Sequence, residues 1–395
     1  MSTTTAASPA GPAAMSAGWG QSLADGAPGI ALLHIARAHA GLAGWEPVHR
    51  LAQAMTREPI QAHPEITNLF QGAPAVAYAL HTAGHPGYHA ALAKLDHSIT
   101  DLIHARLDAA HRRIDRGQLA HAREYDLING LTGLGTYLLH REDRDLLRDV
   151  LAYLVRLIQP IRVETETLPG WWAAGSPDRR QSPRWDDGHA GFGMAHGIAG
   201  PLALLSAAMR RGVTVAGHGE AIRIICIWLD QWRTGQSRQT CWPEVISRDE
   251  LHAGTRTDLG SHRPSWCYGT PGIARALQLA GLAIGDPYRA WIAEQALLGC
   301  LTDDRQLAHL TDAGLCHGWA GLIHTARRAA ADATSDLSVA VAAAVRLMDL
   351  HVRDHGLPAD DGFLEGATGI ELVTMADDSA DTPAGPNWNT CLLTG

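Results

Sequence analysis

The sequence contains few of the features that mark several common classes of protein. Its six cysteines among 395 residues have no regular spacing, which excludes the disulfide framework of a small secreted domain. It has no uninterrupted apolar run of the roughly 18 residues that a transmembrane helix needs. Lys94 is the only lysine and the net charge is −9, so composition gives no reason to expect nucleic-acid binding. We expect a globular protein of the cytoplasm, where neighbouring Cys and His side chains more often indicate metal binding.

The first 17 residues, MSTTTAASPAGPAAMSA, are mostly small. They lack the basic segment and the apolar segment of a signal peptide, and their composition is typical of a disordered tail. We therefore expect residues 1–17 to be a disordered N-terminal tail and residues 18–395 to form a single domain.

Seven stretches repeat one pattern: a polar residue, then Gly-x-x-Gly, then an apolar, helix-like run. The successive leading glycines are 46, 58, 67, 72, 49 and 48 residues apart, so each gap has room for a second helix. The second stretch departs from the pattern, with Ala75 in place of its last glycine. The leading glycines are Gly26, Gly72, Gly130, Gly197, Gly269, Gly318 and Gly366.

The gaps between these stretches also have helical periodicity. In EDRDLLRDVLAYLVRLIQ, for example, apolar residues fall on one stripe of a helix, whereas strand-like alternation is weak throughout the chain. The pattern predicts an all-α array of seven helix pairs, with the glycine-led helices inside and the intervening helices outside. Periodicity alone leaves open whether the array closes into a ring or stays an open solenoid.

The gap of 67 residues between Gly130 and Gly197 holds an insertion over residues 159–193. Its stretch LPGWWAAGSPDRRQSPRWDDGHAGFG, residues 168–193, is rich in Pro, Gly and Trp and cannot be one helix. We expect an elaborated loop near one mouth of the array, where it contacts substrate. An ordinary structural loop is the alternative.

The residue before each leading glycine is polar, although the surrounding segments are apolar. If the repeats are equivalent, these side chains lie at similar height around one end of the array. Helix N-capping explains Asp or Asn at such a position but does not explain His or Tyr, and for Asp25 and Asn129 both explanations stay open. The seven residues are Asp25, Gln71, Asn129, His196, Tyr268, His317 and Glu365.

Cys267 and Cys316 occupy one equivalent position in two consecutive repeats, and His317 follows the second cysteine. Consecutive repeats should be neighbours in space, so these three side chains are expected to meet in the turns before their helices. Two thiolates and one imidazole suit one Zn²⁺ ion, and only three recurring ligands leave a fourth position open for water or a substrate thiolate, as in catalytic zinc sites. The alternative is a set of buried, apolar thiols, which we favour for Cys226 and Cys300.

The motifs AHGIAG, WCYGTPG and CHGWAGL occur in this order and resemble those of the lanthipeptide (lantibiotic) cyclases, the LanC-like family. The resemblance covers the chain from SLADGAPGIALLH to NWNTCLLTG. It implies an α/α toroid of seven inner and seven outer helices with zinc at the central opening. It also implies Michael-type addition of peptide cysteine thiols to dehydroalanine or dehydrobutyrine, which forms thioether rings in a dehydrated precursor peptide that carries a leader.

The resemblance also implies functional residues. Cys267, Cys316 and His317 match the zinc ligands, and His196 matches a motif histidine proposed as acid or base. Asp126 and Arg263 match further active-site positions, and Trp266 and Tyr268 belong to the same motif as Cys267. Residues 159–188 match poorly, so the resemblance does not give the contacts of the leader. We expect a separate dehydratase and an exporter as partners, at the periphery of a membrane-associated complex.

These residues suggest a mechanism. A histidine with a pKa near 6.5 can protonate the enolate that follows thiolate attack. Asp126 would orient or charge the His196 imidazole, and Arg263 would stabilise the enolate oxygen; a structural ion pair is the alternative for both. Two other functions stay open, a zinc-dependent thiol-conjugating relative such as a glutathione-adding enzyme, and a non-catalytic scaffold.

Overall fold

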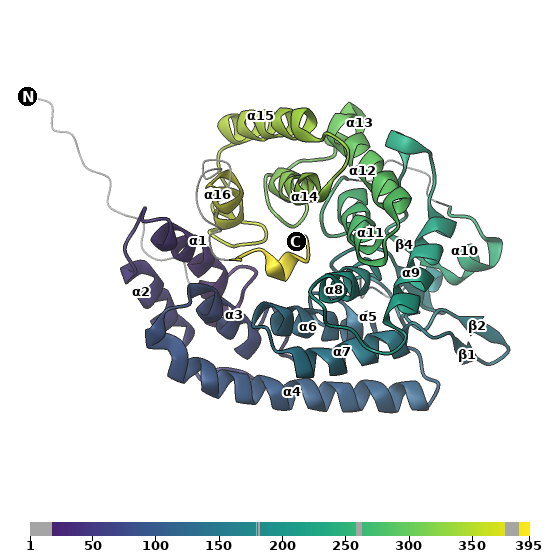
Figure 1. Cartoon of the computed structure of the whole chain (residues 1–395), viewed down its shortest axis with the longest axis horizontal. Coiled ribbons are helices and arrows are strands. Elements are labelled where there is room, and N and C mark those ends of the chain that lie inside the picture. The colour runs from purple at the N-terminus through teal and green to yellow at the C-terminus, as the bar shows by residue number, and fades with distance from the viewer. Residues whose placement is uncertain (1–17, 179, 181, 258–262, 376–386) are drawn as a thin grey trace, which may run out of the picture.

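The computed structural model describes residues 18–178, 180, 182–257, 263–375 and 387–395. The helices form two concentric rings around a central axis (Figure 1), so the predicted α/α toroid is confirmed. No helix in the described part of the chain is both long enough and apolar enough to cross a membrane. The predicted disordered tail, residues 1–17, lies outside the described residues.

The inner ring consists of the seven helices that follow the leading glycines. Their apolar residues are buried on nearly every side, because each inner helix packs against two inner neighbours, and all but α16 also pack against an outer helix within the described residues. The inner helices are α1 (Ala27–His39), α3 (Ala73–Ala83), α6 (Leu131–His140), α8 (Ala199–Arg210), α11 (Thr270–Ile284), α14 (Trp319–Asp332) and α16 (Ala367–Met375).

The outer ring has six long helices within the described residues, where seven were expected. A seventh would follow α16, where residues 376–386 lie outside the described part. The outer helices are α2 (Glu46–Met55), α4 (His89–Asp115), α7 (Arg144–Leu157), α9 (His218–Trp232), α12 (Pro287–Thr302) and α15 (Ser338–His355). Three short helices lie in connections, α5 (Ala122–Tyr125), α10 (Arg248–Ala253) and α13 (Asp304–Leu307).

Backbone hydrogen bonds between the turns before the inner helices close the array into a ring. The N–H of Cys316 donates to the carbonyl of Leu364 at 2.8 Å, and the N–H of Leu364 donates to the carbonyl of Ala24 at 2.9 Å. The seventh repeat is thereby joined to the first, and α16 packs against α1. These contacts show that the array is a closed ring and not an open solenoid, which periodicity alone left open.

The second glycine of the repeat is required by close packing between neighbouring repeats. A Cβ on Gly29 would lie 2.2 Å from the carbonyl oxygen of Leu23 and 2.7 Å from Cβ of Phe363, in the seventh repeat. Only glycine fits at this distance. In the second repeat the leading Gly72 has φ +80°, so the turn there differs and Ala75 takes the place of the second glycine.

Helix N-capping does not explain the polar residues before the leading glycines. Gly26 and Gly130 are themselves the N-cap residues of α1 and α6, and neither helix has a side-chain cap. The capping explanation is therefore wrong for Asp25 and Asn129. Each lies one position outside the cap, in the turn at the end of the ring.

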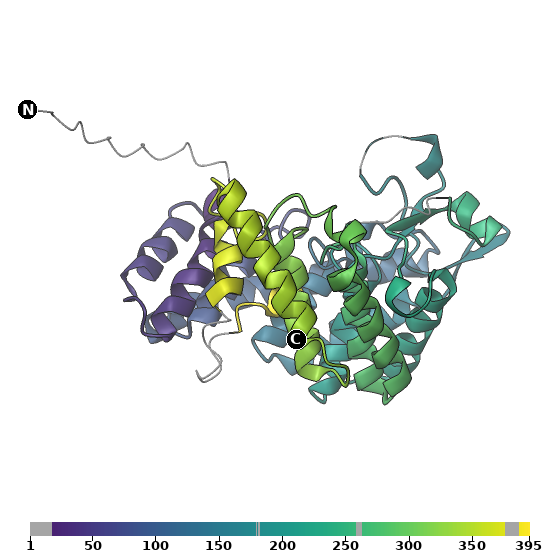
Figure 2. The ribbon, with the colours of Figure 1, turned by 90° about the horizontal axis from the view of Figure 1, so that it is seen from above.

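The insertion between α7 and α8 contains short strands as well as loop. Strand β1 (Ile161–Val163) pairs with β2 (Glu166–Leu168) as an antiparallel hairpin. Strand β3 (His189–Gly191) pairs antiparallel with β4 (Val245–Ser247) from the connection between α9 and α11. Figure 2 shows these two connections extending beyond the ends of the barrel helices on one side.

Residues 387–395, with the 3₁₀ turn η5 (Thr390–Leu392), lie in the centre of the ring (Figure 1). The Tyr78 hydroxyl donates to the carbonyl of Trp388 at 2.9 Å, and the Trp266 indole N–H donates to the carbonyl of Leu392 at 2.9 Å. This segment therefore lies along the axis of the toroid and connects α3 to the turn before α11.

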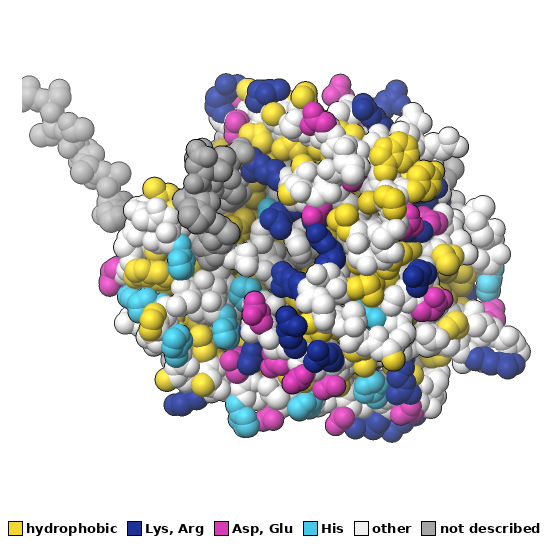
Figure 3. Space-filling view, viewed as in Figure 1, with side chains coloured by type: hydrophobic (Ala, Val, Ile, Leu, Met, Phe, Trp, Pro, Cys, Tyr) yellow, Lys and Arg dark blue, Asp and Glu magenta, His cyan; other side chains and the backbone are white. Residues whose placement is uncertain are grey.

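The opposite ends of the inner helices carry basic side chains. Arg211 donates to the carbonyl of Leu139 at 3.2 Å, and Arg327 donates to the carbonyl of Val373 at 2.6 Å. These donors satisfy carbonyls at helix C-termini and place positive charge at the negative end of the helix dipole. Figure 3 shows Lys and Arg side chains gathered around the middle of one face.

Candidate metal and acid–base site

Local structure places Cys267 and Cys316 side by side. Each lies in the turn that precedes an inner helix, and the N–H of Cys267 donates to the carbonyl of Cys316 at 3.2 Å. The hydroxyl of Ser265 accepts from the N–H of Gly269 at 3.0 Å, which shapes the turn before α11. The equivalence inferred from the repeats therefore brings the two thiols together at the N-terminal ends of α11 and α14.

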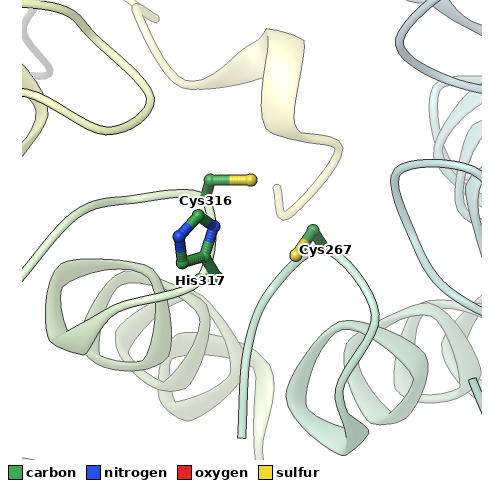
Figure 4. A group of neighbouring side chains, drawn as sticks. All are labelled: Cys267, Cys316 and His317. Carbon is green, nitrogen blue, oxygen red and sulfur yellow. The ribbon is translucent and has the colours of Figure 1, made fainter. Parts of the chain in front are cut away.

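Cys267, Cys316 and His317 converge, with one ligand atom of each within 4.8 Å of the others (Figure 4). Zinc bonds of about 2.3 Å to sulfur and about 2.0–2.1 Å to nitrogen imply tetrahedral edges of about 3.5–3.8 Å. Small side-chain adjustments therefore suffice for these atoms to share one ion. Among the described residues, no other group of three His, Cys, Asp or Glu donors lies this close. The donor set fits Zn²⁺.

The surroundings favour negative charge on sulfur. Both cysteines lie at helix N-termini, where the helix dipole stabilises a thiolate. A hydrogen bond from the Cys316 thiol lowers the pKa of Cys267, against the effect of burial, and His317 adds to this lowering. The same hydrogen bond, together with burial, raises the pKa of the Cys316 thiol. The contact of His317 with Cys267 raises the pKa of His317. Cys267 is thus the sulfur whose surroundings favour the thiolate.

Asp312 is a site residue that the sequence analysis missed. Its Oδ2 lies 3.6 Å from Nε2 of His317 and 3.9 Å from Nη1 of Arg263, and its Oδ1 accepts from the N–H of Gly314 at 3.0 Å. A carboxylate beside a ligating histidine commonly fixes the orientation of the ring. Asp312 lies six residues before Gly318, and Asp360 holds the same place before Gly366, where its Oδ1 likewise accepts from the N–H two residues on. The repeat therefore explains this carboxylate as part of the turn and does not single it out as a site residue. Arg263 is thereby placed on the side of the three candidate ligands.

His196 and Asp126 form an imidazole–carboxylate pair. Nδ1 of His196 lies 2.7 Å from Oδ2 of Asp126. Asp126 is fully buried, and its Oδ1 accepts from the N–H of Asn129 at 2.5 Å, whereas the His196 side chain is 33% exposed. The carboxylate holds one ring nitrogen and leaves Nε2 available to a substrate.

Tyr268 lies between this pair and the cysteines. Its ring centroid is 5.8 Å from that of His196, and it follows Cys267 directly in the chain. Burial raises the pKa of the Tyr268 phenol, and the neighbouring Cys267 and Asp126 add to the effect. The phenol therefore stays protonated at neutral pH and can donate a hydrogen bond.

Trp266 is placed differently from the other predicted site residues. Its side chain is buried in the core, where the indole N–H bonds to the carbonyl of Leu392. It therefore supports the turn of Cys267 from within and does not face the site.

Cys226 and Cys300 fit the interpretation as buried, apolar thiols, whereas Cys241 is only partly buried. All six cysteines are free. Cys226, Cys300 and Cys391 are buried, and burial raises the pKa of Cys226 and of Cys391 to about 12.

The insertion reaches the site, as the sequence suggested. Residues 174–177 line the same cavity as Asp126, His196 and Tyr268. The N–H of Ala174 donates to the carbonyl of Ala120 at 2.7 Å, which holds this part of the insertion against the segment before α5.

Fold and site together define the class of this protein, an α/α toroid with a candidate thiolate metal centre and an imidazole–carboxylate pair at one opening. The model of the lanthionine synthetase C-like protein family matches residues 18–393, and the chain belongs to this family. The nisin biosynthesis protein NisC of Lactococcus lactis subsp. lactis is 27% identical over 203 residues, which cover 51% of this chain and 48% of that protein. The match thus spans about half the length of this relative. The solved structure of nisin cyclase has the same fold, with a TM-score of 0.79 at 21% identity over 95% of this chain and 93% of that chain.

Proposed function

We propose that this protein is a zinc-dependent lanthipeptide cyclase, which adds cysteine thiols of a dehydrated peptide to dehydroalanine or dehydrobutyrine and so forms thioether rings. The convergence of Cys267, Cys316 and His317 within 4.8 Å, in turns that neighbour the His196–Asp126 pair, carries the proposal. Membership of the lanthionine synthetase C-like family and the fold shared with nisin cyclase support it.

The reaction needs a thiolate. A free cysteine thiol has a pKa near 8.5, so it is mostly protonated at neutral pH. A zinc ion held by Cys267, Cys316 and His317 would favour the thiolate form of the substrate thiol. The sulfur lone pair attacks Cβ of the dehydro residue, a C–S bond forms, and the double-bond electrons move into the enolate. One proton then adds to Cα and balances the proton lost from the thiol.

His196 is the candidate for this proton transfer. Its Nδ1 is held by Asp126 at 2.7 Å, so Nε2 can take up a proton and deliver it to Cα. The buried carboxylate also fixes the orientation of the imidazole ring during this step. The Tyr268 phenol and the Arg263 guanidinium are the nearest donors for the enolate oxygen.

The substrate would be a precursor peptide with its leader, dehydrated by a separate dehydratase before cyclisation. We place the reaction in the cytoplasm, where cysteine thiols stay reduced, with an exporter acting on the product at the membrane.

Cyclisation is tested with purified zinc-loaded protein and a dehydrated peptide that contains free cysteines. Intramolecular addition removes free thiols without changing the mass, and thiol alkylation followed by mass spectrometry detects it. With glutathione present, a conjugating enzyme would instead increase the mass of the acceptor. A protein without stoichiometric zinc that leaves every thiol free would be a scaffold, and the proposal would then be wrong.

A further inference from the structure

A cavity of about 660 Å³ opens beside the His196–Asp126 pair. Its walls come from α4, from residues 121–124 at α5, and from residues 174–177 of the insertion, while Asp126, His196 and Tyr268 form its inner end. This volume lies within the range of about 300–1,000 Å³ typical of ligand sites. The cavity is thus large enough for part of a peptide.

The sequence of α4 explains why there is space. Ala105, Ala109 and Ala110 face the cavity, and their small side chains leave it open where larger ones would fill it. Arg106, next to them, donates to the carbonyls of Thr67 at 3.2 Å and Arg123 at 3.3 Å. Arg106 therefore joins α4 to its neighbours, so this wall is fixed in place.

The candidate metal ligands do not line the cavity. Cys267, Cys316 and His317 are absent from its walls, whereas His196 and Tyr268 are part of them. A molecule in the cavity therefore contacts the acid–base pair and Tyr268 but none of the three candidate ligands. The candidate site therefore has a cavity side, with His196 and Tyr268, and a metal-ligand side, with Cys267, Cys316 and His317.

Michael addition assigns a reactant to each side. The sulfur must start at the metal ligands, and the proton must arrive at Cα of the dehydro residue, within reach of His196. The dehydro residue consequently lies on the side of the cavity. The charge of the cavity agrees with this assignment. The positive and negative side chains that line it nearly balance, with two arginines against three carboxylates, and a dehydro residue is uncharged. These charged residues are Glu65, Arg106, Arg123, Glu124 and Asp126.

We propose that this cavity binds the extended, uncharged segment of the peptide that carries the dehydroamino acid, while the segment with the cysteine approaches from the side of Cys267 and Cys316. This inference rests on the proposed cyclase function. It makes α4 and residues 174–177 determinants of which peptides are cyclised.

The first experiment fills the cavity without touching the acid–base pair. In Ala109→Trp an exposed alanine of α4 becomes an indole in the cavity, whereas the matched control Ala93→Trp changes an exposed alanine about 24 Å away along the same helix. We expect kcat/KM for the dehydrated peptide to fall at least about tenfold in Ala109→Trp and to stay unchanged in Ala93→Trp. Zinc content and thermal midpoint should match wild type in both. Affinity for a peptide with every Cys replaced by Ser should fall in parallel.

The outcomes separate the two proposals. If wild type cyclises the peptide and Ala109→Trp does so equally well, the cavity assignment is overturned while the cyclase function stands. If wild type does not cyclise the peptide at all, the function and the inference both fail.

A second experiment tests which segment lies where. Two peptides carry a diazirine residue, one next to the dehydro residue and one next to the cysteine, and cross-linked sites are mapped by mass spectrometry. The first peptide should label residues 105–124, and the second should not. The reverse pattern would overturn the assignment of the two sides.

Discussion

Replacing Asp126 by Asn isolates the contribution of the buried carboxylate to catalysis. In the structure the Oδ2 atom of Asp126 accepts from His196 at 2.7 Å, and Oδ1 accepts from a backbone N–H. Asn keeps the shape and one acceptor, so the fold should persist. It loses the charge, and its amide can donate to Nδ1, which favours the wrong tautomer of the imidazole.

The expected size follows from the hydrogen bond that is weakened. A hydrogen bond to a charged group contributes about 1.5–3 kcal/mol, and about 1.4 kcal/mol corresponds to a tenfold change in rate. The rate of cyclisation in Asp126→Asn should therefore fall about 12- to 150-fold. Single-turnover loss of free thiols, followed by alkylation and mass spectrometry, measures it.

Asp312→Asn provides the matched control. It also removes one carboxylate, but on the side of His317, 3.6 Å from Nε2. Its main effect should be a zinc affinity lower by about 10- to 100-fold, measured by competition with a chelator. Asp126→Asn should retain zinc as wild type does. An Asp126→Asn variant that is fully zinc-loaded and cyclises within twofold of wild type would refute the reasoning about the pair.

Two further predictions concern stability. Gly272→Ala places a Cβ 2.1 Å from a carbonyl oxygen, so it should lower the free energy of unfolding, measured in urea, by about 1–3 kcal/mol. The control Gly44→Ala has nothing within 4 Å of the new atom and should leave this free energy unchanged. Asp332 is partly buried, which by itself would raise its pKa, but hydrogen bonds from Arg210 and Arg275 outweigh burial and lower it. The hydrogen bonds from Arg210 and Arg275 to ionised Asp332 therefore stabilise the fold at neutral pH. This stabilisation is lost as the pH falls below about 4, through the folded-state pKa of Asp332. Asp332→Asn should therefore have a lower thermal midpoint than wild type at pH 7, and the difference should shrink in acid.

The repeats made the helical part of the fold predictable. Each glycine-led stretch became an inner helix because glycine is needed where neighbouring repeats approach within van der Waals distance, as at Gly29. Ring closure was implied by the family resemblance and could not be predicted from the periodicity, because it depends on contacts between the first and seventh repeats, such as the hydrogen bond from Leu364 to Ala24. Periodicity describes neighbours along the chain and carries no information about the two ends.

The convergence of the candidate ligands was predictable for the same reason, since Cys267 and Cys316 hold one position in consecutive repeats. Asp312 was missed because its place beside His317 depends on the fold of the turn, and because Asp360, six residues before Gly366, makes the same turn in a repeat without Cys or His. Trp266 was grouped with the site because it adjoins Cys267 in sequence. In a turn, however, adjacent side chains point in different directions, and this one enters the core.

The placement of Trp266 shows how the site depends on the whole ring. The turn of Cys267 is held to the turn of Cys316 by a backbone hydrogen bond of 3.2 Å, and from beneath by the bond between Trp266 and Leu392. The turn of Cys316 is likewise held to the seventh repeat, because the N–H of Cys316 donates to the carbonyl of Leu364. No single repeat therefore contains the candidate metal site, because the spacing of the thiols is set by contacts among three consecutive turns and the central segment. A closed toroid supplies this spacing, whereas an open array would let the last turn move away and the cysteines separate.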